Sequence, residues 1–405
     1  MKKFLIIVIL LVSLFLIFSK IYYKYFEIHK GVLTKYKGNS ETVTVPFGVM
    51  EIKKGAFEIT DDGISIKKLI IPGTVRKIDK YAFAYICEGD YDSIEEVVFN
   101  KGLKEIGEYA FYGAYIKEIT IPGTVEKIGN GAFSECSLEK VILNEGLKEI
   151  GEYAFEGTHI KEITIPKTVE NIGNGVFNSC PYLETVNVDD NPNFVFEDGV
   201  LYNKDKTKIL CCRKDIYRFT VPKSVVEIGG FATCPIKEII IPGNVRKIDD
   251  SAFSDVYDVN CEEFPRLEKV VLNEGLKEIG KNAFSETSIN EINVPKSVEK
   301  INDYTFFCCR FLRKIILNEG LIEIGKNAFS ETGIKEITVP KSVRKIGEGA
   351  FESCFSLEKV TLNEGLKEIG KRAFCDTLLK EIVIPKSVEK IDDEAFGENV
   401  KIIRK

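Results

Sequence analysis

The phrase GLKEIGK begins at Gly275 and recurs at Gly365, with the near copy GLIEIGK at Gly320, and it is the part of this sequence that comes nearest to a chemical motif. It matches the first seven positions of the phosphate-binding loop GxxxxGK[ST], whose backbone N–H groups cradle phosphates. The eighth residue is asparagine or arginine in these copies, so the hydroxyl that would bind Mg²⁺ is missing. The glycines also recur in other copies without the lysine, which assigns them to bends of a repeat.

Histidine, the usual acid, base and metal ligand near neutral pH, occurs only at His29 and His159. His159 occupies a repeat position that Tyr115, Ser137 and Ser288 fill in other copies, so its place does not indicate chemistry. Neither HExxH nor GxSxG appears. We therefore expect no catalytic residue, no metal site and no cofactor, and we expect that the chain is not an enzyme.

The acidic stretch DDNPN at 189–193, with Glu197 and Asp198 nearby, offers oxygen ligands for calcium. It lacks the EF-hand spacing, and its residues are those of ordinary turns, which we predict here. The 56 basic and 62 acidic residues, net charge −6, are spread evenly, so no basic field indicates nucleic acid as a partner. With 44% hydrophobic residues, the chain has ample material for a core.

The N-terminus reads MKKFLIIVILLVSLFLIF, two lysines followed by an apolar run of 15 residues from Phe4 to Phe18. This is typical of a secretory signal, and it is short for a full membrane span of about 20 residues. No small-residue cleavage site follows, which favours an uncleaved signal-anchor over a cleaved signal peptide in residues 1–26. Either alternative predicts an extracytoplasmic protein, anchored at the cell surface or envelope, or secreted if the segment is cleaved.

The rest of the chain is a repeat, anchored on the phenylalanine of AF and its variants. Most copies are 22 or 23 residues apart. The 14 anchors are Phe57, Phe83, Phe111, Phe133, Phe155, Phe177, Phe231, Phe253, Phe284, Phe306, Phe329, Phe351, Phe374 and Phe396. A unit this short cannot bury an apolar face alone, so the units must stack on one another.

Columns of the repeat can be numbered back from each anchor. Apolar residues recur at −17, −14, −12, −8 and −5, and the spacing of −14 and −12 predicts a short strand with both side chains on one face. Position −11 is proline or asparagine and ends the strand. Position −4 is glycine in eight copies and Asp or Asn in four more, residues that tolerate a positive φ, so we expect a bend there.

The stretch IKEITIPGTVEKIGNGAFSEC, Ile116 to Cys136, resembles the leucine-rich repeat of the BspA type, which occurs in surface proteins of oral and gut bacteria and of some parasitic protists. The resemblance covers about Val43 to Ile403. It implies a repeat solenoid with short parallel strands and about 14 coils of 22–23 residues. It also implies that the partner is a protein, because similar proteins bind host matrix or plasma proteins or other microbes.

An insert interrupts the array between Phe177 and Phe231. Within it, GVLYNKDKTKIL alternates apolar and polar residues around a polar turn and predicts a β-hairpin at Val200 to Leu210. The predicted organisation is a signal segment at 1–26, a linker at 27–42, a repeat block at 43–186, the hairpin insert at 187–218 and a second repeat block at 219–405.

The copies are of two alternating kinds, which suggests a two-coil unit. One kind has proline after the strand and commonly cysteine at +3, and the other has LNEGL and threonine at +3. Position −15 alternates Lys and Glu over most of the array, so we expect an ion-pair ladder between adjacent strands. Five of the 11 cysteines share the +3 column with Thr and Ala, so we read them as small buried residues rather than as disulfides.

The outward position of the strand, −13, forms an uncharged and mostly β-branched stripe beside the charged column. Its residues are Thr120, Ile142, Thr164, Ile240, Val271, Asn293, Ile316, Thr338, Thr361 and Val383. β-Branched residues suit strands for local reasons, and an exposed stripe of them also suits a protein-binding face. The sequence therefore supports two functions: recognition or adhesion through this face, with a host or microbial surface protein as ligand, or a structural spacer or envelope assembly component.

Overall fold

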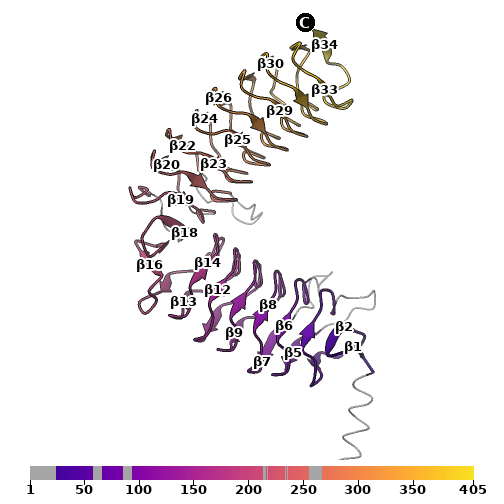
Figure 1. Cartoon of the computed structure of the whole chain (residues 1–405), viewed down its shortest axis with the longest axis vertical. Helices are drawn as coiled ribbons and strands as arrows, with labels where there is room; N and C mark the ends of the chain where they lie inside the picture. Colours follow the sequence, from indigo (N-terminus) through magenta and orange to yellow (C-terminus); the bar gives the residue numbers. More distant parts are fainter. Residues whose placement is uncertain are drawn as a thin grey trace, which may run out of the picture. The chain divides into compact units, whose positions relative to one another are not determined.

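The chain forms two stacks of short coils in a computed structural model, which describes residues 24–57, 66–84, 94–212, 216, 218–232, 234, 236–254 and 267–405. The two compact units are Met1–Asn193 and Phe194–Lys405. Every regular element in the described ranges is a β-strand. Within each unit, successive coils lie side by side with their strands parallel, as Figure 1 shows. The predicted solenoid of short parallel strands is confirmed.

Most coils contribute one longer strand, at positions −15 to −12, as the alternation predicts, and the coil of Phe231 has none in its described residues. In unit 1 these are β3 (Thr42–Thr44), β5 (Lys68–Ile71), β7 (Glu96–Phe99), β9 (Glu118–Ile121), β11 (Lys140–Leu143), β13 (Glu162–Thr164) and β15 (Thr185–Asn187). In unit 2 they are β20 (Glu238–Ile241), β22 (Lys269–Leu272), β24 (Glu291–Val294), β26 (Lys314–Leu317), β28 (Glu336–Val339), β30 (Lys359–Leu362), β32 (Glu381–Ile384) and β34 (Lys401–Arg404).

Most coils also have a two-residue strand, which we did not predict, at −6 and −5 in every case except β19, which lies at −4 and −3 from Phe231. In unit 1 these are β4 (Glu51–Ile52), β6 (Lys77–Ile78), β8 (Glu105–Ile106), β10 (Lys127–Ile128), β12 (Glu149–Ile150) and β14 (Asn171–Ile172). In unit 2 they are β19 (Glu227–Ile228), β21 (Lys247–Ile248), β23 (Glu278–Ile279), β25 (Lys300–Ile301), β27 (Glu323–Ile324), β29 (Lys345–Ile346), β31 (Glu368–Ile369) and β33 (Lys390–Ile391).

The two kinds of strand are hydrogen-bonded differently. The short strands join into continuous sheets, β4 to β14 in unit 1 and β19 to β33 in unit 2. The longer strands pair mostly in twos: β9 with β11, β13 with β15, β20 with β22, β24 with β26, β28 with β30 and β32 with β34. The pairs within the alternating stretches join a proline-type coil to the LNEGL-type coil that follows it. The two-coil unit predicted from the sequence is thus visible as a hydrogen-bonding unit.

The residue after each longer strand explains this pairing. Asparagine side chains of the LNEGL coils donate from Nδ2 to the carbonyl that ends the preceding strand, at 2.7 to 3.0 Å: Asn144 to Ile121, Asn273 to Ile241, Asn318 to Val294 and Asn363 to Val339. A proline at the same position has no N–H to donate back, so one ladder bond is missing at the next step. Strands β3 and β5 pair although Pro72 follows β5, so the missing donor favours the break without forcing it.

The core of each unit is a column of stacked phenylalanines. From Phe253 to Phe396, consecutive ring centroids lie 5.2 to 5.6 Å apart and nearly parallel. Offset stacking of this kind adds to the free energy gained from burying each ring. In unit 1 the same column starts at Tyr36, whose ring lies 5.4 Å from that of Phe57.

Each unit begins with antiparallel strands instead of a coil. Unit 1 begins with β1 (Phe26–His29) and β2 (Val32–Tyr36), and β2 pairs in parallel with β4. The prediction of a linker at 27–42 was therefore wrong, because β1 and β2 within this range form a hairpin that covers the end of the core. Unit 2 begins with β16 (Phe194–Glu197), β17 (Val200–Asn203) and β18 (Lys208–Cys212), of which β17 and β18 are the predicted hairpin.

The glycines at −4 are required for a different reason from the one we expected. Positive φ values occur instead at −2, for example at Tyr109 (51°), Asn282 (53°) and Tyr304 (58°). At Gly280 a Cβ would lie 2.5 Å from the backbone of the preceding coil, at Asp249 and Asp250. Close approach of backbones, not a left-handed bend, therefore selects glycine at −4.

The predicted signal segment falls mainly outside the described residues, which begin at Lys24. In the part of the chain that the structure describes, no helix combines the length and apolarity needed to cross a membrane.

Candidate protein-binding face

The −13 stripe lies on the outward side of the longer strands, as predicted. Eight of its ten residues are exposed, and Val271 and Val383 are half-buried. Their neighbours at −14 and −12 point into the core: on β9, Ile119 and Ile121 are buried while Thr120 between them is exposed. The strand geometry that buries the core thus places the stripe in solvent.

Within each strand pair the stripe residues are in register. Ile142 lies opposite Thr120 on β11 and β9, and Thr338 lies opposite Thr361 on β28 and β30. Asn293 differs from the rest, because its Oδ1 accepts a hydrogen bond of 2.8 Å from Asn318 Nδ2. The stripe is therefore built from paired patches, and Ile240, 55% exposed, is among its most exposed apolar side chains.

A charged column flanks the stripe at −15. Ion pairs join Lys68 to Glu96 at 2.7 Å, Lys269 to Glu238 at 2.5 Å and Lys314 to Glu291 at 3.5 Å. Each of these pairs lies within a hydrogen-bonded pair of strands, so the predicted ladder is confirmed inside the pairs. Exposed pairs of this type contribute on the order of 0.5 kcal/mol each.

A cleft of about 460 Å³ opens on this face in unit 2, across β26, β28 and β30. Its floor includes Ile316, Thr338 and Thr361, three members of the stripe. It spans the step from β26 to β28, where the longer strands of consecutive coils are not hydrogen-bonded. The break between two-coil units therefore coincides with a hollow in the strand face.

The GLKEIGK phrase supplies structural bridges rather than a phosphate site. The Gly275 N–H donates to Ser297 Oγ at 3.0 Å, and the carboxylate of Glu274 accepts from the N–H groups of Lys296 and Ser297. The backbone donors that a phosphate would need are thus used between coils. The same pattern recurs at Glu319, where hydrogen bonds from the Lys341 and Ser342 N–H groups lower the pKa of the carboxyl.

The other candidate ligand groups also have structural places. The turn at 189–193 is held by Asn191, which donates from Nδ2 to the carbonyls of Pro166 at 2.7 Å and Val169 at 3.0 Å. His159 packs edge-on against Tyr182, with ring centroids 5.6 Å apart. Among the described residues there is no group of three or more His, Cys, Asp or Glu side chains that could hold a metal ion.

The +3 column is buried as expected. Cys136, Cys180, Cys309 and Cys354 are buried free thiols, and Cys234 is half-buried. Threonine and cysteine of consecutive coils touch: Thr158 Oγ1 lies 3.3 Å from Cys180 Sγ. Desolvation raises the pKa of the Cys180 thiol to about 12, so this thiol stays protonated and unreactive. Cys87 and Cys261 lie outside the described residues.

Two features of the surface were missed. The first is a second ion-pair ladder at −6 on the short strands: Lys77–Glu105 at 3.1 Å, Lys127–Glu149 at 2.8 Å, Lys300–Glu323 at 3.3 Å and Lys390–Glu368 at 2.8 Å. The second is Arg313, which lines the cleft. Both could have been found by listing every column, because −6 alternates Lys and Glu and Arg313 stands in a column where other LNEGL coils carry glutamate.

A stack of short coils whose parallel strands share an outward face defines a leucine-rich repeat solenoid, a class whose extended faces bind proteins. The chain belongs to the family described as BspA type leucine rich repeat region, which matches in six copies over residues 20–89, 89–208, 203–260 and 277–403. Proteins of this family are typically non-catalytic repeat proteins. No curated protein matches the chain.

Two solved structures show the same fold. A leucine-rich repeat protein from Eubacterium ventriosum is 24% identical, with a TM-score of 0.54, over 76% of this chain and 83% of that one. The pneumococcal vaccine antigen PcpA is 21% identical, with a TM-score of 0.53, over 94% of this chain and 95% of that one. At these identities the likeness concerns the fold alone.

Proposed function

We propose that this chain is a non-catalytic recognition protein of the cell surface or envelope, which adheres to a protein ligand through the −13 stripe. The observation that carries the proposal is the stripe itself: exposed and mostly β-branched residues, three in unit 1 and five in unit 2, beside the charged column at −15. An uncharged and partly apolar strip beside charged residues has the composition of a protein interface.

The cleft adds to the support, because it concentrates apolar surface and hydrogen-bonding groups at one place on the same face. The lysine-flanked apolar run at Met1–Phe18 supports the location, since it has the composition of a secretory signal or signal-anchor. Under this proposal the chain is exported, and the host or microbial surface protein that it binds meets the strand face.

Charging the stripe tests the binding face. The variant Ile142→Lys, Ile240→Lys, Ile316→Lys places cations on outward positions without touching the core, so it should fold and should lose adhesion of the full chain to host cells or matrix. The matched control is Val226→Lys with Ile322→Lys, which replaces exposed apolar residues directly before the short strands β19 and β27, a place where Lys104 and Lys148 already stand before β8 and β12.

The alternative, a structural spacer or assembly component, predicts that both variants behave as the wild type. Unchanged adhesion by a folded stripe variant would therefore remove this face from the proposed function. The location has its own test, which is N-terminal sequencing of the protein from the membrane fraction and the medium. Export would be contradicted if the protein were found in the cytoplasmic fraction instead of in the membrane fraction or the medium.

A further inference from the structure

One coil of unit 2 departs from the charge pattern at −16, the position before each longer strand. Proline-type coils carry lysine there and the coils that follow them carry glutamate, as in the pairs Lys117 with Glu139, Lys161 with Glu184, Lys237 with Glu268 and Lys335 with Glu358. The coils that contain β24 and β26 carry Asn290 and Arg313 instead. The carboxylate is replaced by a guanidinium, and its usual lysine partner by an amide.

This exchange lies at the edge of the cleft on the strand face. Arg313, Lys314 and Lys359 line the cleft together with the carboxylates of Glu319 and Glu336. The Glu319 carboxylate accepts two backbone N–H groups of the next coil, at 3.1 and 3.0 Å, and is occupied there.

Of the three cations that line the cleft, Lys314 and Lys359 each have a carboxylate nearby, and Arg313 does not. Lys314 lies 3.5 Å from Glu291, and Lys359 lies in register with Glu336. The Arg313 side chain is exposed, and within the described part of the chain its guanidinium makes no hydrogen bond or ion pair. The cleft is therefore lined by three cations, Arg313, Lys314 and Lys359, against two carboxylates, Glu319 and Glu336.

The exposed apolar side chains in and beside the cleft favour a ligand that also carries an apolar group. Ile316 is 42% exposed on the floor, with Thr338 and Thr361 beside it. Phe311, 52% exposed, stands two residues before Arg313 on the same turn. A guanidinium binds a carboxylate through two parallel hydrogen bonds, and the β-branched floor accepts an aliphatic side chain.

We propose that this cleft is the docking site for an acidic, aliphatic extended segment of the protein ligand, whose carboxylate pairs with Arg313 while an aliphatic side chain lies on Ile316. The inference rests on the proposed function and deepens it, because it assigns one part of the strand face and one chemistry of partner. Charge complementarity selects an acidic segment over a basic one.

The test uses the full chain and short synthetic peptides of alternating glutamate and valine, glutamine and valine, or lysine and valine, with binding followed by fluorescence anisotropy. Arg313→Glu restores the residue type that other LNEGL coils carry at −16, so folding is not at risk. Lys161→Glu makes the same charge change in the same column of unit 1 and serves as the control.

The glutamate–valine peptide should bind the wild type more tightly than the other two peptides, and its affinity should fall with added salt. Arg313→Glu should weaken this binding by on the order of tenfold, and Lys161→Glu should leave it unchanged. Equal affinity for the three peptides, equal effects of the two substitutions, or no binding of the glutamate–valine peptide by the wild type would overturn the proposal. If the stripe variant still lost adhesion in that case, the proposed function would stand without this docking site.

Discussion

Both units begin with an antiparallel β-hairpin, but they differ in the number of strands between the hairpin turn and the first coil. In unit 1, Lys30 and Gly31 have φ of 50° and 79° and turn β1 into β2, while in unit 2, Asp198 and Gly199 have φ of 49° and 76° and turn β16 into β17. Two consecutive positive φ values are the geometry of a tight hairpin turn. Both turns are followed by Val-Leu, so one short phrase marks the start of each unit.

Unit 2 has one more strand in its cap. In unit 1 the second hairpin strand, β2, pairs with the first short strand, whereas in unit 2 a third strand, β18, takes that place beside β19. The residues that look like an insertion in the array are therefore the first layer of unit 2. An antiparallel start covers the first coil's apolar edge, which a repeat array otherwise leaves open.

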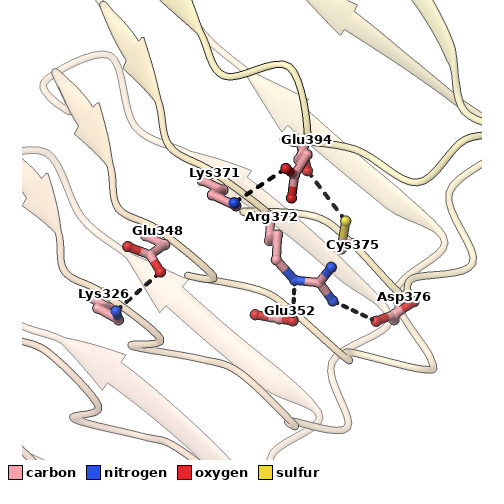
Figure 2. A network of polar contacts seen from close by, with 8 residues as sticks. All are labelled: Lys326, Glu348, Glu352, Lys371, Arg372, Cys375, Asp376 and Glu394. Carbon is pink, nitrogen blue, oxygen red and sulfur yellow. Dashed lines mark hydrogen bonds and ion pairs between the residues drawn. The ribbon is translucent and has the colours of Figure 1, made fainter.

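The units also differ in the partner of a glutamate at +1, the position after the anchor phenylalanine: the partner is a cation in unit 2 and a hydroxyl in unit 1. In unit 2 the Arg372 guanidinium donates from Nε to Glu352 at 2.6 Å and lies 3.3 Å from Asp376, as Figure 2 shows. In unit 1 the equivalent Glu156 has Ser134 Oγ at 3.3 Å and the Glu135 carboxylate nearby instead of a cation. Desolvation, with a smaller contribution from Glu135, raises the pKa of Glu156 to about 7.

The largest effect should come from breaking one phenylalanine column at a time. Phe133→Ala in unit 1 and Phe329→Ala in unit 2 each remove a fully buried ring that stacks on both neighbours. Each should lower the free energy of unfolding of its own unit by about 3–5 kcal/mol. Hydrogen exchange measured by mass spectrometry should show lost protection in coils next to the substitution, and unchanged protection in the other unit.

This pattern follows from contacts between nearest-neighbour coils and from separate caps. Exchange that increased equally in both units for either substitution would mean that the chain unfolds as one body, and that the second cap does not delimit a separate unit.

A smaller effect is expected where glycine allows two coils to approach. Gly280→Ala would place a Cβ 2.5 Å from the backbone of Asp249 and Asp250, so the coils must separate locally, and unit 2 should lose up to about 3 kcal/mol. Gly397→Ala is the control, because the nearest atom to the added Cβ would be Val400 Cγ2 at 3.9 Å and the φ of Gly397 is not positive. Thermal denaturation should separate the two variants, and equal melting temperatures would contradict close approach as the reason for glycine at −4.

The contrast at +1 predicts a pH effect in unit 1 that depends on Glu156. Between the unfolded pKa near 4.5 and the folded pKa of about 7, the folded chain holds a proton on Glu156 that the unfolded chain has lost. Stability should therefore fall as pH rises through this window and stay level above it, by on the order of 2 kcal/mol. Glu156→Gln should remove this slope and stabilise unit 1 at pH 8.

Glu352→Gln is the matched change in unit 2. It removes a carboxylate that Arg372 binds, so it should destabilise unit 2 slightly at neutral pH, by up to about 1 kcal/mol. Denaturant titrations at several pH values would give both results. A wild-type slope that survives Glu156→Gln would show that other groups cause it.

The fold could be predicted from the sequence because the same type of residue recurs at equivalent positions in many copies of the repeat. The apolar columns, the strand at −15 to −12 and the +3 pairs of Thr and Cys each recur in most coils, so single exceptions do not hide them. The caps occur once per unit and could not be averaged in this way. Their signal was short: Asp198-Gly199 and Lys30-Gly31 before Val-Leu.

The short strands were missed for a geometric reason. Two residues such as Lys127 and Ile128 are too few to show alternation, and they become a strand only because the next coil repeats them in register. The role of glycine at −4 was misjudged similarly, because close approach depends on the neighbouring coil rather than on local sequence. For the candidate face, the sequence placed the stripe on the outward side of the strands, and the exchange at Arg313 could have been read from its column. The cleft that Arg313 lines forms only where three coils lie together.

The smallest effect should distinguish the two ion-pair ladders. Lys127 on β10 has Glu105 and Glu149 in register on both sides, because the short strands form a continuous sheet. Lys140 on β11 has a hydrogen-bonded partner strand on one side only, with Glu118 in register. Lys127→Glu should therefore set like charges on two sides and lower the stability of unit 1 by about 1 kcal/mol, and Lys140→Glu by about half as much.

Salt separates this electrostatic difference from other effects of the substitutions. In about 1 M salt the Debye length falls to about 3 Å, so most of both losses should disappear and the two variants should converge on the wild type. If Lys127→Glu and Lys140→Glu lowered stability equally at low salt, charges on neighbouring longer strands would interact as strongly between strand pairs as within them. A difference that survives high salt would assign it to packing of the lysine stems instead of to charge.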